Sequence, residues 1–193
     1  MRIIAGSARG TRLYGAKGYR VRPVLDRVKE SVFAALGDTV EGARVLDLFA
    51  GVGSLGIEAL SRGASQVDFI EQHRATAGSI TDNLARARLG EETNVYTARL
   101  PQGLARVSGR YGLIFIDPPF RIDKRLLEEL FSRIHERGLI DAGGLLLYRH
   151  SPRSRYEPPP EKWSLVERRE YGDSIISIFC VGEEAGCTWR KRL

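Results

Sequence analysis

The chain has 193 residues, of which 42% are hydrophobic and 28% charged, a composition typical of a soluble protein. This length predicts one α/β domain with a small appendage and leaves little room for a second complete domain. No apolar run approaches the roughly 18 to 20 residues of a membrane span, and the opening MRIIAGSARG lacks the apolar core of a signal peptide. We therefore expect a cytoplasmic protein without membrane contact. Neither Cys180 nor Cys187 belongs to a CxxC pair and the three histidines are scattered, so we expect no metal.

Positive charge is concentrated at the N-terminal end. Residues 1–29 contain eight lysines and arginines and one acid, a net charge of +7, whereas the whole chain carries +6. Clustered charge holds a polyanion, which predicts contact with a nucleic-acid backbone; a solvated tail is the alternative. Glycines interleave with apolar residues between positions 3 and 19 as in a hairpin, which favours the first interpretation. The candidate phosphate contacts are Arg9, Arg12, Lys17, Arg20, Arg22 and Arg27.

Helical and extended patterns alternate along the rest of the chain. A helix is expected over 26–36, where Asp26 is a suitable N-cap, and Gly37 ends it. After it we expect strands at 43–48, 67–71, 94–98, 112–117 and 143–149, alternating with helices at 54–62, 74–88, 101–107 and 124–137. This alternation is typical of a mainly parallel sheet with helices on both faces. Four prolines predict a loop at 151–163, followed by an antiparallel edge pair at 164–170 and 174–181.

A glycine-rich loop follows the first of these strands. Gly51, Gly53 and Gly56 form a GxGxxG at the junction of strand and helix, where bare backbone can approach a ligand closely. Two ligands compete at this point: a dinucleotide whose pyrophosphate rests on the helix N-terminus, or S-adenosylmethionine, which has no phosphate. Glu71, at the end of the next strand, suits a ribose diol in either ligand and does not discriminate between them.

Asp47 does discriminate between the two ligands. It lies inside the otherwise apolar strand segment VLDLFAG, where a carboxylate is costly unless a cation or hydrogen-bond donor satisfies it. A pyrophosphate would repel this carboxylate, whereas the ammonium of a methionine moiety would pair with it. The alternative is a structural aspartate that accepts hydrogen bonds from backbone amides of the loop, and the two roles could coexist.

The tetrapeptide DPPF ends a later strand on the same carboxyl edge of the sheet. Its members are Asp117, Pro118, Pro119 and Phe120. The prolines fix the backbone and donate no N–H, so the Asp117 carboxylate and the Pro118 carbonyl form an acceptor-rich corner suited to an amino group. Such a corner can orient an exocyclic amine and stabilise the positive charge that develops on it, and Phe120 can stack on a base. The alternative is a proline turn with Phe120 in the core.

These motifs resemble the N-DPPY/F class of amino-methyltransferases, and most closely the RsmD family of 16S ribosomal RNA (guanine-N2)-methyltransferases. The matching segments are RPVLDRVKESVFAAL (22–36), VLDLFAGVGSLGIEALSRGA (45–64), FIE (69–71), IDPPF (116–120) and YGDSIISIF (171–179). The resemblance implies a Rossmann-like class I fold with a seven-stranded sheet, divided into a basic RNA-binding hairpin (1–22), a methyltransferase domain (23–182) and a tail (183–193). It implies methylation of guanine 966 in an assembling 30S particle by a monomeric enzyme that uses S-adenosylmethionine. The implied cofactor contacts are Asp47, Phe49, Gly51, Gly53, Gly56, Glu71, Arg99 and Leu100, and the implied catalytic residues are Asp117, Pro118, Pro119 and Phe120.

Two positions depart from the family pattern. Arg99 stands where an acidic residue near the adenine is usual, so we expect backbone at its neighbour Leu100 to serve the adenine. Arg149 stands where a glutamate before His150 is usual, and it either adds a phosphate contact or shifts the substrate.

Other functions remain open at this point. The acceptor corner fits any planar amine, including adenine N6 of DNA or a different ribosomal guanine. A nicotinamide-dependent oxidoreductase shares the glycine loop, but Asp47 and the lack of a recognisable hydride-site acid or base argue against it. A non-catalytic RNA-binding assembly factor is the alternative outside the enzymes.

Overall fold

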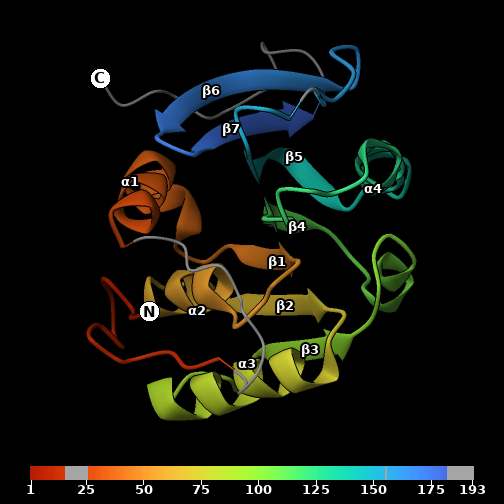
Figure 1. Ribbon diagram of the computed structural model, residues 1–193. Helices are drawn as coiled ribbons and strands as arrows, with labels where there is room; N and C mark the ends of the chain where they lie inside the picture. The colour runs from red at the N-terminus through yellow and green to blue at the C-terminus, as the bar shows by residue number, and fades with distance from the viewer. Residues whose placement is uncertain (16–25, 155, 182–193) are drawn as a thin grey trace.

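The computed structural model describes residues 1–15, 26–154 and 156–181. The helices are α1 (Asp26–Leu36), α2 (Ser54–Ser61), α3 (Arg74–Ala87) and α4 (Lys124–Glu136), with the 3-10 turns η1 (Gly37–Val40) and η2 (Gln102–Arg106). The strands are β1 (Arg44–Leu48), β2 (Gln66–Glu71), β3 (Thr93–Thr97), β4 (Tyr111–Ile116), β5 (Ile140–His150), β6 (Trp163–Tyr171) and β7 (Ser174–Val181). In the described part of the chain these strands form one sheet in the order β3-β2-β1-β4-β5-β7-β6 (Figure 1).

The strand directions confirm the expected mixed sheet. Strands β3, β2, β1, β4 and β5 are parallel, and β7 and β6 close the edge in antiparallel pairs. The chain runs outward from β1 to β3 and then returns to β4, so the order reverses between β1 and β4, the place where open α/β sheets bind ligands. The strand predicted at 143–149 is too short. β5 begins at Ile140, because a register shift after Tyr111 lets Ile140 pair with Tyr111 ahead of the apolar run.

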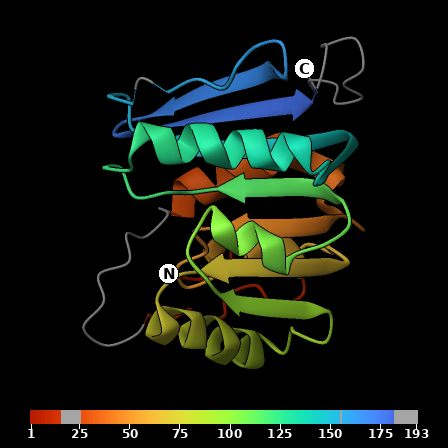
Figure 2. The ribbon, with the colours of Figure 1, turned by 90° about the vertical axis from the view of Figure 1, so that its right-hand side faces the viewer.

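Helices cover both faces of the sheet, as expected. On one face, α1 and α2, which lie behind the sheet in Figure 2, and α3 bury side chains such as Phe33, Ile57 and Ile80 in one core. On the other face, η2 and α4 pack Leu104 and Phe131 over the central strands. Each face therefore has its own apolar core, and the carboxyl edge of the sheet is left to loops. Among the described residues, no helix combines the length and the apolar character that crossing a membrane requires.

The N-terminal segment folds back on itself and packs against the helices behind the sheet. Ile3 donates its N–H to Thr11 O at 3.0 Å, and one antiparallel bridge joins Arg2 and Arg12. Buried apolar side chains of this segment, Ile3 and Leu13 among them, belong to the same core as α1 and α2. Gly6 passes so close to α2 that a Cβ there would lie 1.6 Å from Ser61 O. The segment is thus fastened to the body of the domain.

A buried carboxylate on α2 holds this segment in place. Glu58 accepts hydrogen bonds from the backbone N–H groups of Ile4 at 2.8 Å and Ala5 at 3.0 Å. It also pairs with Lys29 Nζ at 3.1 Å and Arg62 Nε at 2.8 Å. Lys29 is fully buried, so this member of the basic N-terminal cluster cannot contact a phosphate backbone and does not add to the basic surface.

Candidate active site

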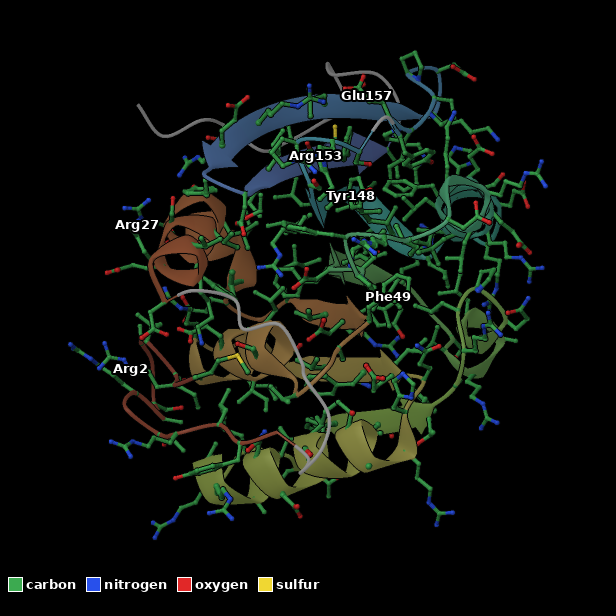
Figure 3. The ribbon with its side chains drawn as sticks, viewed as in Figure 1. Arg2, Arg27, Phe49, Tyr148, Arg153 and Glu157 are labelled. Carbon is green, nitrogen blue, oxygen red and sulfur yellow. The ribbon has the colours of Figure 1, made fainter. Side chains whose placement is uncertain are left out.

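A pocket of about 670 Å³ opens where β1, β2 and β4 end. That volume is within the range of small-molecule sites, and the position is the one expected from the reversal of strand order. Figure 3 labels Phe49 at this end of β1. The residues predicted from the sequence that line the pocket are Asp47, Phe49, Gly51, Glu71, Arg99, Leu100, Asp117, Pro118, Pro119 and Phe120. The fold therefore brings all of the candidate cofactor and catalytic residues except Gly53 and Gly56 to one cavity.

The turn between β1 and α2 depends on left-handed backbone. Phe49 and Gly51 both have φ of 58°, and Gly53, the N-cap of α2, has φ of 80°. At Gly56 the constraint is packing: a Cβ would lie 2.3 Å from Phe69 Cε1, so glycine lets α2 approach β2. Gly53 and Gly56 are not among the described residues that line the pocket. Their part in the motif is to shape the turn and seat the helix.

Asp47 is a buried carboxylate in the pocket wall, with 1% of its surface exposed. Its Oδ2 accepts a hydrogen bond from Gly56 N at 2.9 Å, so the structural role considered for this residue is present. Burial raises the pKa of Asp47 well above its usual value; the Gly56 hydrogen bond opposes this rise, and the nearby Asp117 and Glu71 add to it. A cation placed beside Asp47 would relieve this unfavourable environment of the ionised form.

Glu71 ends β2 on the side of the pocket opposite the DPPF turn. Its Oε2 accepts from Gly51 N at 2.9 Å and its Oε1 accepts from His73 N at 2.9 Å. These two bonds hold the carboxylate beside the glycine-rich turn. Each carboxylate oxygen has a further lone pair, so Glu71 can also accept from a ligand hydroxyl.

The DPPF turn continues directly from β4. Asp117 N donates to Leu48 O at 3.4 Å, which keeps the turn beside the end of β1, and Ile122 N donates to Pro119 O at 3.1 Å. Pro118 is buried, while Asp117 and Phe120 are partly exposed to the pocket they line. The turn thus presents a carboxylate, a proline-fixed backbone and an aromatic ring to one cavity.

Arg149 is part of this site. Its Nε lies 2.7 Å from Asp117 Oδ1, and 6% of the Arg149 side chain and 14% of the Asp117 side chain are exposed. The register across β4 and β5 turns Arg149 inward onto Asp117, so of the two roles considered for it, a direct effect on the substrate in the pocket fits its position better than a phosphate contact at the surface. Its neighbour His150 is bonded through Nε2 to Ser177 Oγ at 3.1 Å, and burial lowers the pKa of His150.

Sequence reasoning missed several pocket residues. Ser54, the first residue of α2, lines the pocket, and among the described residues its buried Oγ has no hydrogen-bond partner. The only signal for it was its place at the start of a helix after a glycine turn. Met1 also lines the pocket, which brings the N-terminal segment to the rim. In the described ranges, no group of three or more histidine, cysteine or acidic side chains is arranged to hold a metal ion.

The basic residues of the N-terminal region are distributed differently from their sequence order. Arg9, Arg12 and Arg27 are exposed, and Arg2 pairs with Asp26 at 2.8 Å. Figure 3 shows Arg2 and Arg27 pointing outward from the same side of the molecule. The remaining candidate phosphate contacts, Lys17, Arg20 and Arg22, lie outside the described residues.

Comparisons with known proteins identify the family. The family model described as conserved hypothetical protein 95 matches residues 1–180. The chain is 34% identical to the ribosomal RNA small subunit methyltransferase D of Escherichia coli K12, over 93% of this chain and 89% of that protein. It is equally identical to the YlbH protein of Bacillus subtilis, over 93% of this chain and 98% of that protein. The solved structure of E. coli yhhF superposes with a TM-score of 0.83 at 32% identity, over 94% of this chain and 98% of that one. The chain therefore belongs to the conserved hypothetical protein 95 family, the family of ribosomal RNA small subunit methyltransferase D.

Proposed function

We propose that this protein transfers a methyl group from S-adenosylmethionine to the exocyclic N2 of a guanine in 16S ribosomal RNA during assembly of the 30S subunit. The observation that carries this proposal is that Asp47 and Asp117, at the ends of the neighbouring strands β1 and β4, line the same pocket. Asp47 is suited to the ammonium of the methyl donor and Asp117 to the amine of the acceptor base. A shared cavity is what direct transfer between two bound molecules requires.

The pocket has groups that match S-adenosylmethionine, which when bound supplies a methyl group on a positively charged sulfur. Asp47 offers a carboxylate to the ammonium of the methionine moiety. Ser54 Oγ, which has no hydrogen-bond partner in the described part of the chain, and the N-terminus of α2 suit its carboxylate, since both present hydrogen-bond donors. Glu71 would accept hydrogen bonds from the ribose hydroxyls. The adenine would lie along Arg99 and Leu100 at the end of β3.

The DPPF turn acts on the acceptor amine. Asp117 and the Pro118 carbonyl accept the two N–H bonds of the exocyclic amine, and this geometry turns the nitrogen lone pair toward the methyl group. As the new bond forms, Asp117 stabilises the positive charge on nitrogen and then accepts or relays the released proton. Phe120 stacks on the base, which must leave its helix or loop to enter the pocket.

The N-terminal segment supplies the RNA contacts. Glu58 fastens this segment to α2, and Met1 lines the rim of the catalytic pocket, so phosphates held by Arg9 and Arg12 would lie on a surface continuous with the site. In this proposal the protein works in the cytoplasm as a monomer, with 16S ribosomal RNA of the assembling subunit as its partner.

Cofactor binding is expected to depend on pH through Asp47. The pKa of this carboxyl is raised, so at a pH below that value it holds a proton, which must leave before the ammonium can pair with it. Affinity for S-adenosylmethionine should therefore rise with pH across a range above the usual aspartate pKa of 3.8, with protons released on binding. Isothermal titration in two buffers of different ionisation enthalpy measures this release. Asp47→Asn should abolish it, whereas Asp82→Asn, an exposed aspartate of α3, should not.

The same titration tests the class of cofactor. We expect S-adenosylmethionine to bind and NAD to give no heat. Binding of NAD alone would refute the methyltransferase proposal and favour an oxidoreductase.

RNA affinity is expected to fall steeply with salt concentration. Each phosphate contact contributes roughly 0.7 to 0.9 to the slope of log affinity against log salt. Replacing the exposed Arg9, Arg12 and Arg27 with alanine should therefore reduce that slope by about 2 to 3. Filter binding of 16S RNA at several salt concentrations measures it. The matched control replaces the exposed Arg88, Arg106 and Arg110, and an equal loss in both variants would show a diffuse charge effect only.

A further inference from the structure

Arg149 and Asp117 form a charge pair in the wall of the catalytic pocket. Ile116 and Tyr148 are partners in the parallel pairing of β4 and β5, so the next residue of each strand emerges side by side at the carboxyl edge. The resulting bond joins Arg149 Nε to Asp117 Oδ1 at 2.7 Å, and both residues line the pocket. The pocket therefore contains a carboxylate with a guanidinium fixed directly beside it.

A purely structural role accounts poorly for this pair. Removing two charges from water is unfavourable, and a buried ion pair adds little net stability compared with apolar residues of similar size. Asp117 is also the acceptor that the proposed reaction needs. Nε is only one of the donors of Arg149, because a guanidinium has five N–H bonds in a planar fork and no acceptor. The remaining donors can face a ligand in the cavity.

We propose that Arg149 is a specificity-determining residue that selects guanine over other bases carrying an amine. This inference rests on the proposed function. Along its Watson–Crick edge, guanine presents the N2 amine, the N1–H and then the O6 carbonyl: two donors followed by one acceptor. A carboxylate with about four lone-pair sites can accept from N2 and N1, and the neighbouring guanidinium then donates to O6. Asp117 as acceptor, followed by Arg149 as donor, is therefore complementary to the edge of guanine in that order.

Other bases that carry an amine do not match this order of acceptor and donor. With the N6 amine of adenine or the N4 amine of cytosine held by Asp117, the next ring atom is an unprotonated nitrogen. Its lone pair faces a carboxylate oxygen, which is repulsive, and no carbonyl follows at the position of O6 in adenine. Selection then comes from mismatched polar groups as well as from favourable contacts, which is how large preferences between bases of similar shape arise.

The test compares two substrates that both carry the N2 amine. 16S RNA is ligated with either guanine or 2,6-diaminopurine at the target nucleotide and reconstituted into 30S particles. 2,6-Diaminopurine has an unprotonated N1 and an amine in place of O6. Single-turnover rates at subsaturating enzyme give the preference ratio. We expect the wild type to prefer guanine by about 10- to 100-fold. Arg149→Met should lower that ratio to a small residual preference, because only the mismatch between N1 and Asp117 then remains.

The ratio is internal to each variant, so it does not depend on the folded fraction. Arg149→Lys keeps the charge without the planar fork and should give an intermediate ratio, and it decides the matter if Arg149→Met is inactive on both substrates. The control is Arg153→Ala. Arg153 is an exposed residue three positions after the end of β5 (Figure 3), and its replacement should leave the full preference for guanine. A wild type that methylates both bases equally, or Arg149 variants with an unchanged ratio, would refute the inference and leave the proposed function intact. A wild type that methylates neither would refute the proposed function itself.

Discussion

Replacing Asp117 with alanine is expected to lower the rate of methyl transfer by about 100- to 1000-fold, the usual consequence of removing one group that stabilises developing charge. The Asp117 carboxylate lies 2.7 Å from Arg149 Nε, in the pocket that Asp47 also lines. The DPPF turn contains no second carboxylate that could replace it. The measurement is single-turnover transfer of a labelled methyl group to undermethylated 30S particles. RNA affinity should change little, because Asp117 contacts the base and no phosphate.

Two further variants separate chemistry from folding in this experiment. Asp117→Asn keeps an acceptor for Arg149 and for one N–H of the amine, so its rate should lie between those of the alanine variant and the wild type. Asp141→Ala removes an exposed carboxylate from the opposite end of β5 and should have no effect. An alanine variant at Asp117 that transfers methyl groups at the wild-type rate would remove this residue from the mechanism.

Replacing Glu58 with alanine is expected to destabilise the fold by about 3 to 5 kcal/mol, because it leaves a buried charge without its partner. Both Lys29 and Glu58 are fully buried, and Glu58 also accepts from the backbone N–H groups of Ile4 and Ala5. Burial lowers the pKa of Lys29, and its attraction to Glu58 opposes that change. Urea denaturation of the full chain measures the free energy of unfolding.

The control for this prediction is an exposed ion pair of the same kind. Lys124 and Glu128 on α4 lie 3.3 Å apart with more than half of each side chain exposed, so Glu128→Ala should change the unfolding free energy by less than about 1 kcal/mol. The double variant Lys29→Met, Glu58→Gln removes both charges and should recover part of the loss. Equal effects at Glu58 and Glu128 would contradict the role assigned to the buried pair.

The spacing of apolar residues predicts most of the helices and strands, because this spacing depends on residues that are close together in the sequence. The strands of the sheet interior are apolar runs and the helices have apolar stripes, so their order along the chain already favours a parallel sheet. Asp47 and Asp117 were identifiable because one carboxylate lies inside such a run and the other directly follows one, where burial is costly without a partner. The start of β5 was not identifiable, since its pairing depends on a register shift beside Tyr111 that no local pattern encodes.

The features that the sequence could not settle concern residues whose role depends on distant neighbours. The GxGxxG pattern does not distinguish a glycine that meets a ligand from one that lets a helix approach a strand, and Gly56 is of the second kind because it faces Phe69. Arg149 required knowledge that β4 and β5 are adjacent and in register. Lys29 had a usable signal: it shares a helical face with Phe33 and Leu36, which predicts a position turned toward the core.

The most direct test of the central claim is to map the modified nucleotide. Undermethylated 30S particles are incubated with the protein and a labelled methyl donor, and the 16S ribosomal RNA is digested and analysed by mass spectrometry. We expect one labelled product, N2-methylguanine at a single position. Label on an adenine N6, or no label on RNA when the cofactor is bound, would contradict it.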